Sequence, residues 1–278
     1  MPPLTPQLLT AILRDLVNVE TLKLFDLEYH EDHEPTESTT TARIVLSRLS
    51  KLTVMDCEVK IMQHILSVIS LSPSATVSIS RQFSSDITAA RQALLQGSCV
   101  VLPADRSGLP VLSHLTAVHV KDSDALRTIS GTSPPTRDGQ NGGEFWSSIF
   151  CHLLADSHAG HQVPVLADFL NMYICRVAPL EVLHVEVMAD RLPDIDWPTV
   201  LSPFPKLQDL TVTCEGGKAH HVFRGLNPDN SPGRSWGREL VVCPRLEKLR
   251  LVGLGTLSDT ALIPTASACL EHRWTALG

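Results

Sequence analysis

One nine-residue pattern of apolar positions recurs along the chain and limits how it can fold. In its clearest copy, Cys243, Leu246, Leu249 and Leu251 are separated by two, two and one intervening residues. Five further copies are Leu16, Val19, Leu22 and Leu24; Leu46, Leu49, Leu52 and Val54; Leu112, Leu115, Val118 and Val120; Val177, Leu180, Leu183 and Val185; and Phe204, Leu207, Leu210 and Val212. The last two apolar residues of each copy fall on one face of a short strand, because side chains alternate along a strand. Such a strand needs a neighbouring copy on each side to bury that face.

This pattern is typical of a leucine-rich-repeat solenoid. We therefore expect an α/β fold: an irregular leucine-rich-repeat array with a curved parallel sheet and helices on its outer face. A single array spans residues 1–278, and a flexible loop at about 130–144 joins its two halves. Two intervals between copies are about twice as long as the others, so each is expected to hide a degenerate repeat, with Val77 and Ile79 as one candidate.

Periodicity and composition also predict the individual elements. Repeat strands are expected at 21–25, 51–55, 117–121, 182–187, 209–213 and 248–252, and a short outer or intervening strand at 76–80. Helices are expected at 4–16, 58–69, 85–96, 145–154, 165–175, 197–201 and 259–272. Polar or glycine-rich and proline-rich composition predicts loops at 29–41, 130–144 and 216–237.

Composition narrows the function. A net charge of −7 gives no reason to expect nucleic acid or an anionic membrane as the main partner. The first residues lack the basic and apolar regions of a signal peptide. The seven cysteines are scattered, odd in number and without a C-x-x-C motif. They indicate reduced, mostly buried residues in an intracellular protein, cytoplasmic or nuclear.

Two longer segments carry a family resemblance. They are residues 46–57 and residues 65–80, which run from an expected strand through a helix to a Leu-Ser-Pro turn at 71–73 and a second strand. These segments resemble the leucine-rich-repeat region of F-box-like proteins from mushroom-forming fungi, and residues 204–212 and 243–254 are similar to later repeats of that family.

The resemblance implies a protein–protein interaction module, the substrate-recognition part of an F-box-type ubiquitin-ligase receptor. A protein substrate or partner would bind the concave face. The family's F-box is not visible, so a ligase adaptor is expected only if an F-box is supplied elsewhere. Both ends look cut from a longer architecture, and a truncated fragment without an independent role is a further alternative.

Candidate catalytic and metal-binding residues are few. His30, Asp32 and His33 lie in a polar stretch without a second ligand pair at zinc spacing. Cys151, His152, His158 and His161 are closer to a ligand set. They support the alternative of a hydrolase or metal-binding enzyme with a site between the two halves. No nucleophile elbow or phosphate-binding loop is present, so we assign no catalytic residue, metal or cofactor.

The middle residue of each repeat strand is the main candidate for binding, because parallel neighbouring strands place these side chains in a row. By alignment the row is Lys23, Thr53, His119, His184, Thr211 and Arg250, flanked by Thr21, Lys51, Ala117, Val182, Asp209 and Lys248. Several members are basic although the chain is acidic. The row is therefore expected to favour an acidic or phosphorylated peptide.

Overall fold

The computed structural model describes residues 4–29, 43–83, 102–103, 105–123, 126–135, 142–151, 179–190, 192–226, 242–253 and 260–277. The chain is an α/β protein that forms two compact units. Unit 1 comprises Met1–Leu115 and Asp124–Ser157, and unit 2 comprises Thr116–Ser123 and His158–Gly278. The described residues contain nine main strands. They pair mostly in parallel, and the arrangement is mixed because it includes antiparallel pairing.

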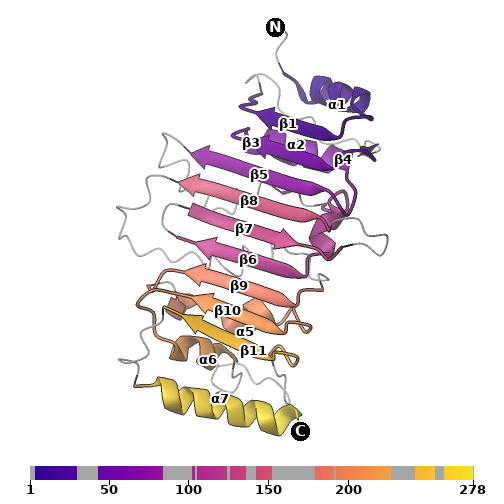
Figure 1. The fold of residues 1–278 in the computed structure, drawn as a ribbon. Helices are drawn as coiled ribbons and strands as arrows, with labels where there is room; N and C mark the ends of the chain where they lie inside the picture. Colours follow the sequence, from indigo (N-terminus) through magenta and orange to yellow (C-terminus); the bar gives the residue numbers. More distant parts are fainter. Residues whose placement is uncertain are drawn as a thin grey trace. The chain divides into compact units, whose positions relative to one another are not determined.

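Unit 1 contains five of these strands (Figure 1). Their order is β1 (Thr21–Phe25), β3 (Lys51–Met55), β5 (Thr76–Phe83), β8 (Glu144–Cys151) and β7 (Leu126–Thr132). The first four run parallel, whereas β7 is antiparallel to β8. The expectation of an all-parallel sheet is therefore wrong at β7. A short parallel pair, β2 (Ile44–Val45) and β4 (Ile69–Ser70), lies apart from this sheet.

The predicted repeat strands pair in the expected register. In unit 1, Leu22 is opposite Leu52, and Leu52 is opposite Val77, so the degenerate copy at residues 76–80 is a full member of the sheet. Its strand, β5, intervenes between β3 and β8 and extends to Phe83. Leu52 and Val77 are fully buried. The apolar face predicted from the spacing is therefore confirmed at Leu52 and Val77, although Thr53, between Leu52 and Val54, is also buried.

Unit 1 contains two described α-helices, which pack against each other. Helix α1 (Pro6–Asp15) begins with Thr5 as its N-cap, whose hydroxyl accepts a hydrogen bond from the Leu8 amide. Helix α2 (Val59–Val68) lies behind the strands in Figure 1. Its buried residues Ile61, Met62, Ile65 and Leu66 have no exposed surface. The two helices are also tied by a 3.0 Å hydrogen bond between Thr10 Oγ1 and His64 Nε2.

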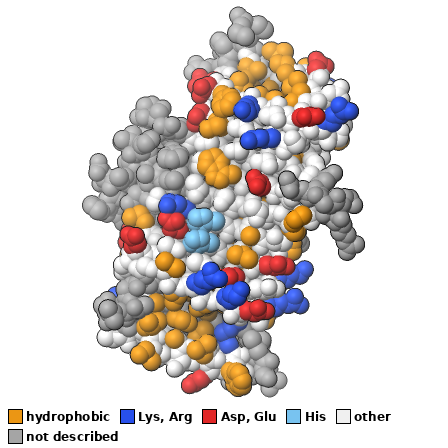
Figure 2. Space-filling model, in the orientation of Figure 1, with side chains coloured by type: hydrophobic (Ala, Val, Ile, Leu, Met, Phe, Trp, Pro, Cys, Tyr) orange, Lys and Arg blue, Asp and Glu red, His pale blue; other side chains and the backbone are white. Residues whose placement is uncertain are grey.

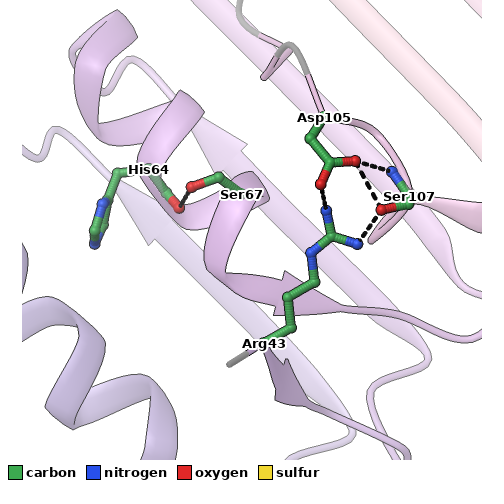
Figure 3. A network of polar contacts seen from close by, with 5 residues as sticks. All are labelled: Arg43, His64, Ser67, Asp105 and Ser107. Atoms are coloured by element: carbon green, nitrogen blue, oxygen red, sulfur yellow. Dashed lines mark hydrogen bonds and ion pairs between the residues drawn. The ribbon is translucent and has the colours of Figure 1, made fainter. Parts of the chain in front are cut away.

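A polar network holds the segment after residue 102 against the β2–β4 pair. Figure 3 shows the Arg43 guanidinium between Asp105 and Ser107, with which it forms an ion pair and a hydrogen bond. Hydrogen bonds from Ser107, followed by the contact with Arg43, lower the pKa of the Asp105 carboxyl to about 2. The Leu71 amide donates to the carbonyl oxygen of Gly108. A Cβ at Gly108 would lie 2.3 Å from the Ile69 carbonyl oxygen, so this close approach requires glycine.

Unit 2 contains four parallel strands, in the order β6 (Ala117–Asp122), β9 (Val182–Val187), β10 (Asp209–Thr213) and β11 (Lys248–Val252). Val118, Leu183, Leu210 and Leu249 are register partners in turn. The helices are α5 (Trp197–Leu201), α6 (His220–Leu226) and α7 (Leu262–Leu277), and α5 and α6 lie behind the strands in Figure 1. Two short 3-10 helices complete the elements: η1 (Pro110–Ser113) in unit 1 and η2 (Leu192–Asp194) in unit 2.

The same two backbone features recur at several copies of the pattern. In four copies, the amide of the second apolar residue donates to the carbonyl of the first, three positions earlier. The pairs are Val19 to Leu16 at 3.0 Å, Leu49 to Leu46 at 3.1 Å, Leu207 to Phe204 at 3.1 Å and Leu246 to Cys243 at 3.0 Å. After three strands, the residue four positions beyond the aligned leucine has a positive φ: Asp26 (49°), Asp56 (54°) and Gly253 (73°). Equivalent positions thus have equivalent conformations.

Three predicted elements are wrong. The helix at 145–154 is strand β8 over its described part, and the loop at 130–144 is strand at both ends, in β7 and β8. The loop at 216–237 contains helix α6. The predicted helices at 85–96 and 165–175 lie outside the described residues, as does nearly all of the loop at 29–41. Among the described helices, none combines the length and apolar character that crossing a bilayer requires.

Candidate functional site

The predicted row of binding residues lies on the strand faces opposite the apolar core, in both units. In unit 2 the side chains of His119, His184, Thr211 and Arg250 occupy one register position on four adjacent strands. Lys248 is in the neighbouring row, opposite Asp209. We call this surface the polar face of unit 2. The alignment of the copies therefore placed all five predicted unit 2 residues on one surface.

Two stacked histidines are at the centre of this face. The rings of His119 and His184 are 4.3 Å apart with an interplanar angle of 12°, and Figure 2 shows histidine side chains beside basic and acidic groups. Each ring reaches toward the residue two positions further along the next strand. His119 Nε2 is 3.7 Å from Glu186 Oε2, and His184 Nε2 is 2.8 Å from Thr213 Oγ1. The first distance is too long for a hydrogen bond.

The electrostatics of the polar face of unit 2 are balanced. Lys121 Nζ binds the Glu186 carboxylate, and Arg250 Nη2 is 3.5 Å from Asp209 Oδ2. Burial, and next the proximity of His184, lower the pKa of His119 against the opposing effect of Glu186. The His119 ring is therefore uncharged at neutral pH. The positive charge that we expected on this face is therefore largely cancelled. Of its three cations, Lys121 and Arg250 each face a carboxylate, and Lys248 is the third.

The remaining predicted residues lie in unit 1. Lys23 and Thr53 are register partners, and the same row continues through Ser78 to Trp146. We call this surface the polar face of unit 1. Lys23 is exposed, whereas only 8% of Thr53 is exposed. Lys51, in the neighbouring row, is opposite Thr21 on one side and Thr76 on the other.

The other candidate sites gain no support from the described residues. Cys151 ends strand β8 instead of lying in a helix, and His152, His158 and His161 are outside the described ranges, as are His30, Asp32 and His33. In the part of the chain that the structure describes, no three metal-ligating side chains gather at one place. Four of the cysteines are free and buried: Cys57, Cys214, Cys243 and Cys269. Burial raises the pKa of each thiol, that of Cys243 to about 12, which disfavours the reactive thiolate.

The strand alignment did not single out several residues of these faces. Three of them follow a residue of the predicted row by two positions on the same strand: Lys121, Glu186 and Thr213. Since side chains two residues apart on a strand point to the same face, the alternation along the strand is the signal that locates them. Trp146 was placed in a helix, and its position beside Ser78 required knowledge of the β5–β8 pairing.

Known proteins supply no further guide to this surface. The chain matches no protein-family model, no curated protein sequence and no solved structure.

Proposed function

We propose that the chain is a non-enzymatic protein-interaction module whose polar sheet faces bind a protein partner. The observation that carries this proposal is the row of register-matched, outward side chains on parallel strands. Such rows offer many weak contacts over a broad surface, which suits recognition of a protein more than of a small molecule. On the polar face of unit 2, one histidine is hydrogen-bonded to a hydroxyl group: His184 contacts Thr213 on the neighbouring strand. We interpret this pair as a contact within the sheet and not as a catalytic pair.

The underlying architecture proposed for each unit is an irregular leucine-rich-repeat array. The recurring turn hydrogen bond, the positive φ after the strand and the in-register apolar positions support it, since repeats place equivalent residues in equivalent environments. The antiparallel strand β7 interrupts this regularity in unit 1.

Within this proposal, the resemblance to fungal F-box-like proteins suggests a role as the substrate-recognition part of a ubiquitin-ligase receptor. The chain would select a protein by shape and charge and would leave covalent chemistry to other subunits. A ligase adaptor would join only through an F-box supplied elsewhere. The buried free cysteines are consistent with the cytoplasm or the nucleus as its location.

Cross-linking tests where a partner binds. The chain is used as bait in an extract, the retained complex is treated with an amine-reactive cross-linker, and linked lysines are identified by mass spectrometry. We expect links from Lys23, Lys51 and Lys248, which are exposed on the polar faces. Lys60 is the matched control, because it is exposed on helix α2, away from these faces.

Links that concentrate on Lys60, with none from the polar faces, would contradict the proposal. Retention of a protein alone would not support the proposal, because non-specific adsorption also retains protein.

A further inference from the structure

We propose that the polar face of unit 1 binds an extended acidic segment of a protein, with two carboxylates on alternate residues followed by an apolar side chain. This inference rests on the proposed function and names the partner's chemistry. It is carried by Lys23, Lys51 and Phe25, which lie on β1 and β3 in three successive rows.

The two lysines have the spacing of alternate side chains in an extended peptide. Lys51 is opposite Thr21, and Lys23, two residues after Thr21, is opposite Thr53. The two lysines are thus diagonal neighbours. With strands about 4.8 Å apart and a rise of about 3.3 Å per residue, their Cα atoms are roughly 8 Å apart. Alternate residues of an extended peptide are about 6.6 Å apart, so each ammonium group can pair with its own carboxylate.

The charge of these lysines is not compensated as it is in unit 2. Lys121 and Arg250 face Glu186 and Asp209, but no carboxylate among the described residues is within ion-pair distance of Lys23 or Lys51. The acidic residue in their rows, Glu144, is two strands away from Lys51. The register places Thr21, Thr76 and Ser78, which carry hydroxyl groups, beside the pair instead. The surface is therefore complementary to an anionic partner.

An apolar contact continues from the lysines in the same direction. Phe25 follows Lys23 by two residues, is 48% exposed and is the register partner of Met55. An exposed aromatic ring beside uncompensated cations is matched by a segment with an apolar residue after its carboxylates. An extended peptide running along the strands then places its first glutamate on Lys51, its second on Lys23 and its apolar residue on Phe25.

Fluorescence anisotropy with a defined peptide tests this inference. The probe is a fluorescein-labelled seven-residue peptide with glutamates at its second and fourth positions and a leucine at its sixth. We expect saturable binding that weakens with added salt. Replacing both lysines (Lys23→Glu with Lys51→Glu) should raise Kd about 10-fold or more, because like charges then face each other. Phe25→Ser should weaken binding separately.

The controls identify the site and the chemistry. Lys60→Glu on α2 removes the same kind of charge elsewhere and should leave Kd within about two-fold. A peptide with lysines in place of the glutamates should bind the Lys23→Glu, Lys51→Glu protein better than the unaltered one. Circular dichroism before titration confirms that each variant is folded.

Three outcomes overturn the inference. They are absence of saturable binding by the glutamate peptide, equal Kd values for the lysine variant and the Lys60→Glu control, and preference for a peptide with one phosphoserine in place of the two glutamates. None of these outcomes changes the result of the cross-linking experiment. In that experiment, a link from Lys248 on the polar face of unit 2 reports partner binding independently. Failure of this inference is therefore distinguishable from failure of the proposed function.

Discussion

Leu52→Ala should lower the free energy of unfolding by about 2–5 kcal/mol, as measured by urea denaturation. Leu52 has no exposed surface and lies between Leu22 and Val77, its register partners on the two adjacent strands. Truncation removes apolar contacts and leaves a cavity that neighbouring strands cannot fill without breaking their own pairing.

The matched control is the adjacent residue of the same strand. Lys51 points to the polar face and is exposed, so Lys51→Ala should change stability by no more than about 0.5 kcal/mol. Similar losses for the two variants would mean that the strand does not separate a buried face from an exposed one.

Gly225→Ala should lower the free energy of unfolding by about 1–3 kcal/mol, despite the higher helix propensity of alanine. A Cβ at this position of helix α6 would lie 2.3 Å from Trp197 Cβ and 2.6 Å from its Cδ1. Trp197 is only 1% exposed, so its ring cannot move aside without disturbing the core of unit 2. Thermal unfolding measures the loss as a lower Tm.

A second glycine and a rescue variant separate the clash from general glycine effects. Gly216 has a φ of 74° and open space around it, so Gly216→Ala reports backbone strain alone. In a Trp197→Gly background, Gly225→Ala should cost little, because the Cβ and the ring that clash are both gone. A full cost in that background would show that the contact is not its cause.

Much of the sheet could be predicted from the sequence. The strands β1, β3, β9, β10 and β11 have their apolar residues at period two, and burial follows that alternation in β9 and β10. In β3, Thr53 is buried as well, and the leucines of β11 are only half-buried. A local pattern suffices there because each strand presents one face to the helices and the other away from them. The pattern also aligned the copies correctly, since register requires equivalent residues to be opposite each other.

Strands β7 and β8 were missed for physical reasons. Ser130, Gly131 and Thr132 are small and polar, a composition that indicates a loop, yet Gly131 is opposite Phe145 in the sheet. The spacing of apolar residues after Phe145 also fits a helix face. Strand structure arises here from pairing with β5, a contact distant in sequence that propensity does not encode.

Helix α6 was missed because composition outweighed periodicity in the prediction. The stretch around it is rich in glycine, proline and asparagine, but Val222 and Leu226 are four residues apart and both buried. Gly225 lies where helix α6 meets Trp197, so tertiary packing overrides its low helix propensity.

Charge on the polar faces was predicted less well than position. The alignment located Lys23, His184 and Arg250 but not Glu186, the carboxylate that binds Lys121. Asp209 was placed beside Arg250, but its 3.5 Å contact depends on side-chain conformation, which spacing does not specify. The sequence therefore indicated one basic row, whereas the structure separates uncompensated lysines in unit 1 from balanced charges in unit 2.

The stacking of register-matched apolar residues is tested most directly by a double-mutant cycle for Leu52 and Val77. Leu52→Ala, Val77→Ala and the double variant are compared by urea denaturation, with Leu22 and Val77, two strands apart, as the reference pair. Direct packing predicts a coupling energy of about 0.5–3 kcal/mol for Leu52 and Val77 and a smaller one for the reference pair. Equal coupling in the two cycles would contradict the proposed register, and the polar faces built on it would no longer stand.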